Sequence, residues 1–209
     1  MSNRHINRRN ALFSGAAFIG VSAIGAAPAL AQKISLTQIS SYLNGFQTAQ
    51  SAFTQINGDG TLSTGTLYIR RPGRVRFEYN SPDNGLVIAG GGQVAVFDPK
   101  SNVPPDQFPL KRTPLSIILE REVNLSKARM VTGHSVDGPT TVVTAQDPEN
   151  PEYGNIQLHF SSGPTELRKW VITDGSGGQT TVILGALETG VRIPARYFSI
   201  VQEVEARGI

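Results

Sequence analysis

The sequence predicts a mainly β protein with a few short helices, in which the strands form an antiparallel sheet. Apolar residues alternate with polar ones in many short segments, and a period of two is typical of strands with one buried face. Clusters of Gly, Pro, Asn and Asp separate these segments at short intervals, which is typical of an antiparallel meander. Only two segments, near residues 35–45 and 113–119, have apolar residues at helical spacing, so both predicted helices are short.

The first 31 residues have the features of a signal peptide. They start with a positively charged stretch, continue with an uncharged apolar run over residues 11–27, and end in Ala29-Leu-Ala31, a small-x-small cleavage site before Gln32. The pair Arg8-Arg9 resembles a twin-arginine signal, so the general secretory route and the twin-arginine route both remain open. A retained membrane anchor is the alternative to cleavage. We expect the mature protein to be exported.

The mature chain, residues 32–209, is expected to form a single domain. The full sequence has a net charge of +3, and residues 1–31 contribute three arginines and no acidic residue. Without them, 16 Lys and Arg balance 16 Asp and Glu, so charge gives no evidence for nucleic-acid binding. The chain has no cysteine, which excludes disulfides, thiolate metal sites and lipid attachment through cysteine. We therefore expect a soluble mature protein.

A short amphipathic helix is predicted at the start of the mature chain. Ser35 and Gln38 match a capping box, and Gly45 provides a stop. Apolar residues between them fall on one face of the helix. Residues 46–56 lead into the first strand, and we expect Phe53 and Ile56 to point toward the apolar interior.

The next hairpin, residues 65–79, has one apolar and one charged face. Its two strands meet at Pro72-Gly73, a dipeptide that favours a turn. By alternation, the apolar face carries Leu67, Ile69, Val75, Phe77 and Tyr79.

Arg71 falls on the apolar face of this hairpin if the strand stays regular up to the proline. Unpaired arginine is rarely buried, so in one interpretation the turn lets Arg71 swing into water. In the other, its guanidinium donates to carbonyl or carboxylate oxygens at the rim of a cavity. Both interpretations remain open on the residues alone.

A second hairpin is predicted over residues 85–97, with Leu86 and Ile88 in its first strand and a glycine turn at residues 90–92. A strand rather than a helix follows the glycines, which argues against a phosphate-binding loop. Residues 98–109 contain four prolines and are predicted to form an exposed connection rather than a strand.

A two-turn helix is predicted next, with Thr113 as N-cap and Pro114 at the first helical position. Leu115, Ile118 and Leu119 form its apolar stripe. This stripe fits an ordinary core contact as well as a helix lying over the concave side of a sheet.

The C-terminal half is predicted to form short strands that are separated by clusters of turn residues. They are predicted over residues 128–132, 140–145, 156–160, 167–173 and 180–184, with a last strand around residues 197–201. Trp170 lies on the apolar face of the fourth of these strands.

Features of an enzyme are missing from the mature sequence. Its two histidines, His134 and His159, lack neighbouring acidic residues in a metal-ligand pattern, and no nucleophile elbow, zinc motif or nucleotide loop occurs. We expect no catalytic residue, no metal site and no cofactor.

Several motifs resemble one known family in order and spacing. They are a strand ending in Arg71-Pro72 with an aromatic-rich return strand, Phe53-Thr-Gln55 upstream, Leu86-Val-Ile88, Phe97-Asp-Pro99 and Thr113-Pro-Leu115. Together they cover most of residues 36–122 and resemble the periplasmic outer-membrane lipoprotein carrier family (LolA-like).

This resemblance implies a single strongly curved antiparallel sheet, a half-open β-barrel, covered by a lid of short helices. A sheet with one apolar face and so few helices would enclose an apolar cavity if it curls without being plugged. We expect the following residues to line the cavity: Phe53, Leu67, Ile69, Val75, Phe77, Tyr79, Leu86, Ile88, Leu115, Ile118, Leu119 and Trp170. The resemblance assigns Arg71 to gating of the lid.

The implied function is that of a monomeric periplasmic carrier, without enzymatic activity, that binds the acyl chains of lipoproteins and transfers them from the inner to the outer membrane. The implied partners are an inner-membrane lipoprotein-releasing transporter and an outer-membrane acceptor. Two alternatives remain: an envelope sensor or regulatory binding protein of the same fold, and a glycolipid carrier.

Overall fold

The computed structural model describes residues 32–113 and 115–209. The predicted signal peptide and Pro114 lie outside the described residues. The strands are β1 Thr48–Ile56, β2 Leu62–Arg70, β3 Arg74–Tyr79, β4 Leu86–Gly90, β5 Gln93–Phe97, β6 Asp106–Pro109, β7 Val131–Asp137, β8 Thr140–Gln146, β9 Gly154–Ser162, β10 Thr165–Asp174, β11 Gln179–Leu184 and β12 Glu188–Thr189. The helices are α1 Leu36–Asn44, α2 Ser116–Leu119 and α3 Ile200–Arg207, with 3₁₀ turns η1 Leu110–Arg112, η2 Pro151–Tyr153 and η3 Ala195–Phe198.

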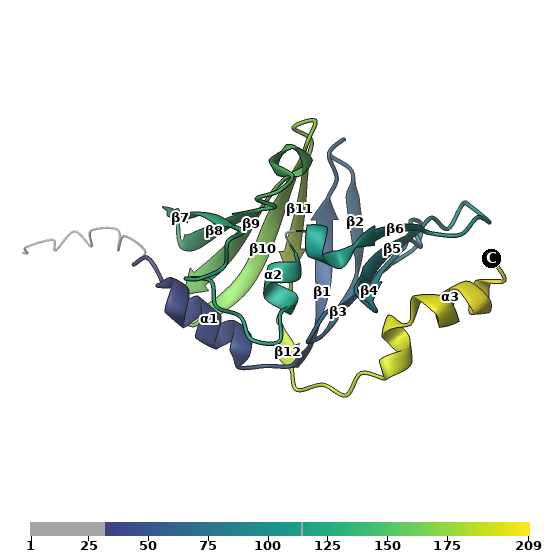
Figure 1. Cartoon of the computed structure of the whole chain (residues 1–209), viewed down its shortest axis with the longest axis horizontal. Coiled ribbons are helices and arrows are strands. Elements are labelled where there is room, and N and C mark those ends of the chain that lie inside the picture. The colour runs from purple at the N-terminus through teal and green to yellow at the C-terminus, as the bar shows by residue number, and fades with distance from the viewer. Residues whose placement is uncertain (1–31, 114) are drawn as a thin grey trace, which may run out of the picture.

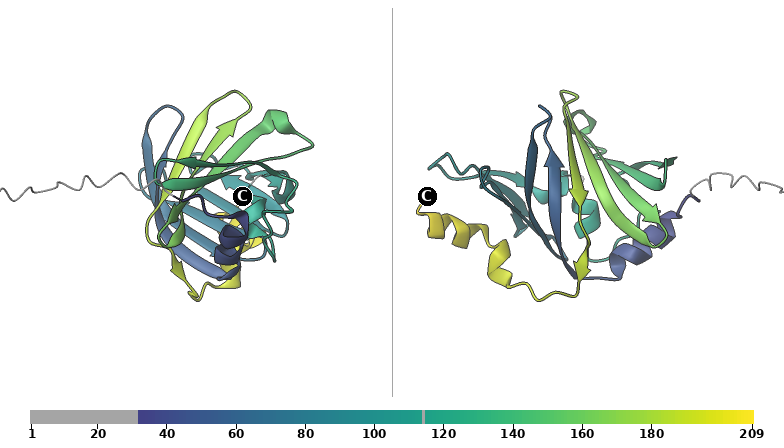
Figure 2. Two further views of the ribbon diagram at one scale, coloured as in Figure 1. Left: turned by 90° about the vertical axis from the view of Figure 1, so that its left-hand side faces the viewer. Right: turned by 180° about the vertical axis from the view of Figure 1, so that it is seen from behind.

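The strands form one 12-stranded antiparallel sheet in the order β6-β5-β4-β3-β2-β1-β11-β10-β9-β8-β7, with β12 paired to β1. Two meanders therefore meet at a single junction, where Phe53 of β1 lies opposite Leu184 of β11. The sheet bends so that its two halves face each other, and its outermost strands, β6 and β7, do not pair (Figures 1 and 2). A mainly β fold with a strongly curved, unclosed sheet is thus confirmed.

The hairpin of β2 and β3 has the predicted register. Leu67 lies opposite Phe77, and Ile69 lies opposite Val75. All four side chains are buried, because residues directly opposite each other share one face of an antiparallel pair. Gly73, in the turn, has φ +69, a conformation that favours glycine.

Helix α1 covers one end of the concave side (Figure 1). The predicted capping box is present, because the Ser35 hydroxyl accepts from the Gln38 backbone N–H at 3.2 Å while the Gln38 side chain accepts from the Ser35 N–H at 3.1 Å. Ile39 and Leu43 are fully buried beneath the helix.

The segment between β6 and β7 crosses the opening of the sheet and carries η1 and α2 (Figure 1). We call α1 together with residues 110–125 the lid. The predicted two-turn helix is wrong: α2 has 4 residues and begins after Leu115. Thr113 does not cap it, since its hydroxyl donates to the Leu110 carbonyl at 2.8 Å and closes the preceding 3₁₀ turn instead.

Residues 98–109 are not wholly an exposed connection. Asp106–Pro109 form β6, which pairs with β5 at the edge of the sheet. An edge position tolerates Pro109, because the strand needs no donor on its outer side. The strand predicted over residues 128–132 also differs, since β7 begins at Val131 and extends to Asp137.

The predicted last strand around residues 197–201 is wrong. The aromatic and β-branched residues there belong to η3 and to α3, whose N-cap Ser199 accepts from the Gln202 N–H at 3.2 Å. Ile200 and Val204 are four residues apart, so both can face the sheet from one side of a helix. Together with Ile209, they pack on the outer face of β4 and β5 against Leu86, Ile88, Ala95 and Phe97.

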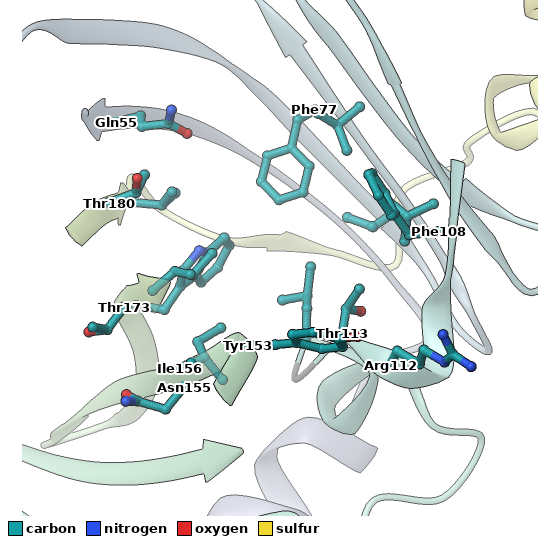
Figure 3. A pocket seen from close by; sticks show the side chains of 18 of the residues that line it. Gln55, Phe77, Phe108, Arg112, Thr113, Tyr153, Asn155, Ile156, Thr173 and Thr180 are labelled. Atoms are coloured by element: carbon teal, nitrogen blue, oxygen red, sulfur yellow. The ribbon is translucent and has the colours of Figure 1, made fainter. Parts of the chain in front are cut away.

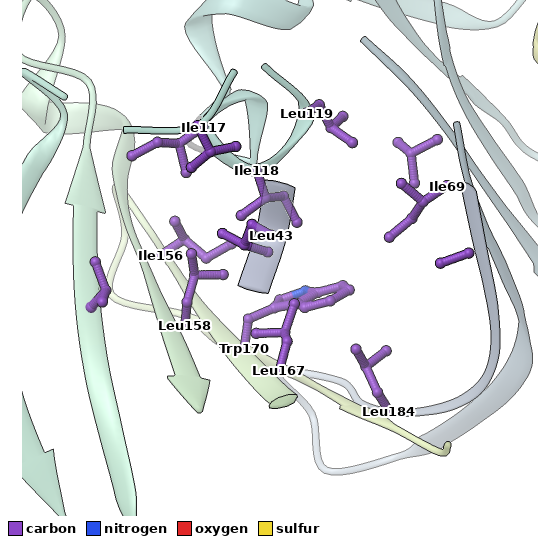
Figure 4. Packing of buried hydrophobic residues seen from close by; sticks show 14 of the residues in the cluster. Leu43, Ile69, Ile117, Ile118, Leu119, Ile156, Leu158, Leu167, Trp170 and Leu184 are labelled. Carbon is purple, nitrogen blue, oxygen red and sulfur yellow. The ribbon is translucent and has the colours of Figure 1, made fainter. Parts of the chain in front are cut away.

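The main core lies between the concave face and the lid (Figure 4). Trp170 of β10 stands at its centre with 1% of its surface exposed. Ile117, Ile118 and Leu119 of α2 pack into the same cluster. Since burying one such side chain contributes about 1.5–3 kcal/mol, the apolar side chains of the lid stabilise the arrangement of the lid on the sheet.

His159 is buried on the outer face of β9. Its Nδ1 lies 3.2 Å from the Thr140 hydroxyl and 3.9 Å from a carboxylate oxygen of Asp137, while its Nε2 is buried without a partner among the described residues. Burial lowers the pKa of His159, and Lys169 lowers it further, whereas Asp137 raises it. The neutral ring is therefore favoured in the folded state.

We expect this histidine to make folding sensitive to acid. Because its pKa is lower in the folded chain, the unfolded chain takes up the proton more readily. Its contribution is present above the ordinary histidine pKa of about 6.5 and is lost as the pH falls through the lower, folded value. When urea unfolding is measured from neutral to mildly acidic pH, the free energy of unfolding should fall less steeply for His159→Gln than for the wild type. Identical pH profiles would contradict this assignment.

Candidate functional site

A cavity of about 690 Å³ lies on the concave side, between the two halves of the sheet (Figure 3). Its wall is mostly apolar, and it falls within the usual size range of small-molecule sites, about 300–1,000 Å³. The apolar lining consists of Val75, Phe77, Tyr79, Val87, Val94, Phe108, Pro109, Leu115, Tyr153, Ile156, Trp170, Ile172 and Val182. The polar lining consists of Gln55, Arg112, Thr113, Asn155, Thr173 and Thr180, together with Gly154.

Aromatic rings form the floor of the cavity. Phe77 contacts Trp170 edge to face with the ring centres 6.0 Å apart, and Phe53 contacts both Phe77 and Tyr79 in the same way. The Tyr79 hydroxyl donates to the Gln55 amide oxygen at 2.7 Å. Because this polar pair is satisfied internally, the floor offers apolar contact without demanding a polar partner from a ligand.

The structure places the twelve predicted lining residues in three different environments. Val75, Phe77, Tyr79, Leu115 and Trp170 line the cavity. A second group is buried in the main core beside it without reaching its wall; this group consists of Phe53, Leu67, Ile69, Ile118 and Leu119.

Leu86 and Ile88 do not face the cavity, which corrects the prediction for these two residues. They lie on the outer face beneath α3, and Val87 faces inward, opposite Phe77. Strand β4 is apolar on both faces because α3 covers its outer side, so alternation alone did not reveal its orientation.

Several lining residues were not singled out from the sequence. Ile156, Ile172 and Val182 lie on regular strands, and alternation with Trp170 and the cross-strand register would have indicated them. Phe108 and Tyr153 are different. They follow proline-rich turns, where no periodicity indicates a direction, and both are more than half exposed at the margin of the cavity.

Arg71 is buried, with 7% of its surface exposed. Its Nε donates to the Glu120 carbonyl at 3.0 Å, and its Nη2 donates to the Asn44 side-chain oxygen at 2.9 Å and to the Arg121 carbonyl at 3.3 Å. Its Nη1 donates to the carbonyls of Leu43 and Phe46. Of the two interpretations, the one in which the guanidinium meets carbonyl oxygens describes the structure.

These contacts join three segments that are distant in sequence. The Leu43 carbonyl belongs to the last turn of α1. The carbonyl oxygens of such a turn have no partner within the helix and carry partial negative charge. A guanidinium, whose donors form a rigid fork, can satisfy several such oxygens at once. Burial lowers the pKa of Arg71, but arginine remains charged in proteins, so these are charge-assisted bonds.

Asn44 reinforces the same junction and was not recognised from the sequence. Its amide donates to the Val123 carbonyl at 2.8 Å, and its oxygen accepts from the Val123 N–H at 2.9 Å. Ser40 accepts from the Leu125 N–H at 3.0 Å. The two parts of the lid are therefore bonded to each other as well as to Arg71.

Over residues 32–113 and 115–209, no group of three or more His, Cys, Asp or Glu side chains could hold a metal ion. No helix in that part of the chain combines the length and the hydropathy needed to cross a bilayer.

The family-model match and the curated relatives point to one family. The model of the family described as outer membrane lipoprotein carrier protein LolA matches residues 44–201. An outer-membrane lipoprotein carrier protein of Coxiella burnetii (strain RSA 331 / Henzerling II) is 29% identical over 156 residues, covering 72% of this chain and 69% of its own. That of Pseudomonas aeruginosa (strain UCBPP-PA14) is 23% identical over 191 residues, covering 87% and 91%.

Among solved structures, a putative outer membrane lipoprotein-sorting protein domain from Vibrio parahaemolyticus has a TM-score of 0.46 and 8% identity, covering 78% of this chain and 94% of that one. The match to the family model spans most of the described residues, including β1 to β11 and the junction at Arg71. This chain therefore belongs to the outer membrane lipoprotein carrier protein LolA family.

Proposed function

We propose that this protein binds the acyl chains of lipoproteins in its cavity and carries them from the inner to the outer membrane. The observation that carries the proposal is an apolar cavity beneath a lid that a buried arginine ties to the sheet. Names of the curated relatives support the same class of cargo. The role is that of a carrier, with neither catalysis nor a cofactor.

The cavity provides the driving force for capture. Moving a methylene group from water into an apolar environment contributes about 0.8 kcal/mol, so one acyl chain in contact with the aromatic floor is strongly favoured over the same chain in water. Affinity is limited by the cost of opening the lid, because a ligand that binds the open state must first supply that free energy.

Release of the cargo depends on the same free energy of lid opening. Arg71 and the lid carbonyls stabilise the closed, empty state, and a loaded cavity holds the lid away from these bonds. When the lid closes after transfer, the hydrogen bonds of Arg71 form again, which favours transfer of the cargo to an acceptor. Arg71 thus makes binding reversible by stabilising the state without cargo.

We place this cycle in the periplasm. Residues 1–31 are the proposed signal peptide, and residues 32–209 the proposed carrier domain. An inner-membrane transporter would supply the cargo, and an outer-membrane acceptor would receive it. The protein would act as a monomer.

The first test concerns Arg71. Arg71→Leu removes charge-assisted bonds worth ~1.5–3 kcal/mol each, enough to shift an open–closed balance roughly tenfold or more. The variant should capture an acylated lipoprotein at least as tightly as the wild type and pass it poorly to acceptor membranes. Arg71→Lys, which keeps the charge and loses the fork, should be intermediate.

The matched control is Arg168→Leu, an exposed arginine that pairs with Glu166 on β10. It should behave as the wild type in both capture and transfer. Thermal unfolding of all the variants separates loss of gating from loss of folding. Equal transfer by the wild type and a folded Arg71→Leu, or weaker capture by it, would show that Arg71 does not gate the lid.

A second test uses two isoleucines of equal exposure on opposite faces of the sheet. Ile172, 40% exposed, lines the cavity, and Ile183, 41% exposed, lies on the outer face. Ile172→Glu places a carboxylate where an acyl chain would bind and should weaken capture roughly tenfold or more, whereas Ile183→Glu should not. Capture can be measured by displacement of a fluorescent fatty acid, and equal loss in both variants would refute the assignment of the cavity.

A third test concerns export. N-terminal sequencing of the protein from the periplasmic fraction should give Gln32 or a residue close to it, because Ala29-Leu-Ala31 fits a cleavage site. Recovery of intact Met1, or retention in the membrane fraction, would contradict a cleaved signal peptide.

A further inference from the structure

Two arginines, Arg70 and Arg74, lie on the outer face beside the turn that carries Arg71, and two more, Arg192 and Arg196, belong to the segment that Arg70 contacts. Arg70 and Arg74 are directly opposite each other at the end of the β2–β3 hairpin. Arg70 donates to the Ile193 carbonyl at 3.0 Å, which brings the neighbouring Arg192 to the same place. Arg196 follows in η3, and both Arg192 and Arg196 are exposed.

None of these four arginines forms an ion pair within the described residues. The other charges of this region are matched differently. Arg76 pairs with Glu78 at 2.6 Å and with Glu203 at 3.1 Å, and Glu203 also pairs with Arg207. These four arginines are therefore not neutralised by ion pairs, although Glu205 lines the same groove as Arg74 and the chain from Gln32 onward is formally neutral.

A groove of about 780 Å³ opens beside them, between α3 and the outer face of the sheet. Arg74 and Glu205 lie on its margin, Gln93 and Gln107 offer side-chain amides, and Val201 and Val204 give it an apolar side. Val201 is 66% exposed, which is high for an aliphatic residue on a helix whose other side packs on the sheet.

We propose that this groove docks a carboxylate-rich peptide segment of a partner protein. The arginine forks would pair with its carboxylates, since guanidinium and carboxylate match each other in bidentate geometry. The amides would bond to its backbone, and Val201 would pack against its apolar side chains. The occupant is a protein segment rather than a membrane, because the surface is a groove with a polar wall and a bilayer presents no ridge to fill it.

The location links docking to the junction of the lid. Arg70 and Arg74 flank Arg71 and Gly73 in the same turn, and the Gly73 N–H bonds to the Leu119 carbonyl of α2 at 2.8 Å. A partner held by Arg70 and Arg74 would therefore sit directly behind the residue that ties the lid to the sheet. This docking site is separate from the cavity, and its existence does not depend on which lipid the cavity takes.

The test uses a fluorescent peptide of alternating Glu and Leu, with a peptide of alternating Gln and Leu as its uncharged control. The mature protein should bind the acidic peptide in a way that weakens as salt is added, because added salt screens exposed charges. The combined variant Arg70→Gln, Arg74→Gln and Arg196→Gln should weaken binding roughly tenfold. Val201→Asp should also weaken it.

Arg129→Gln, an exposed arginine of the segment before β7, is the matched control and should bind the acidic peptide as the wild type does. Capture of a fluorescent fatty acid by the triple variant should be unchanged, so a failure of docking is distinguishable from a failure of the cavity. Unaltered peptide binding in the folded triple variant would overturn the proposal. So would arginine-dependent binding to vesicles of equal parts phosphatidylglycerol and phosphatidylcholine in the absence of peptide binding.

Discussion

The buried guanidinium of Arg71 is the interaction on which the arrangement of the lid depends. It donates to oxygens of α1, of residue 46 and of residues 120–121, and these segments have few other polar links to the sheet. A buried charge is tolerated only where its donors are satisfied, so the lid carbonyls and the arginine require each other. Loss of either partner leaves the other without compensation in a poorly solvated place.

The cavity exists because the lid fills only part of the space enclosed by the curved sheet. The two halves of the sheet turn their apolar faces toward each other, yet α2 is a single turn and fills only part of the space between them. The walls of the cavity next to Trp170 are therefore not covered by the lid, and the cavity lies beside a well-packed core. Rigid packing on one side and open space on the other allow a ligand to be held without reorganisation of the sheet.

Much of the fold could be predicted from the sequence, because alternation is clear wherever one face of a strand meets water. This applies to the β2–β3 hairpin and to β9 and β10, and it placed Val75, Phe77 and Trp170 correctly. Prediction failed where both faces are covered. Leu86 and Ile88 were assigned to the wrong face because α3, which hides them from water, was not predicted.

The C-terminal error has a local cause. Tyr197, Phe198, Ile200 and Val201 favour strands by propensity, and the cap at Ser199 with contacts to the outer face of β4 outweighs that preference. Arg71 could be recognised as unusual by its position, but its acceptors could not. They are backbone carbonyls and one asparagine from segments whose proximity only the folded chain reveals.

The junction of β1 with β11 has a consequence for how the chain reaches this fold. Strands β1 to β6 can pair as neighbouring hairpins while the chain emerges, but the second edge of β1 waits for β11, which is far away in sequence. Contacts of such long range are slow to form, because the loop between them must first be closed. Until then one edge of the first half-sheet stays unpaired, and an unpaired edge invites association with other chains. The chain is thus most exposed to aggregation in the interval between the appearance of its first strand and of its eleventh.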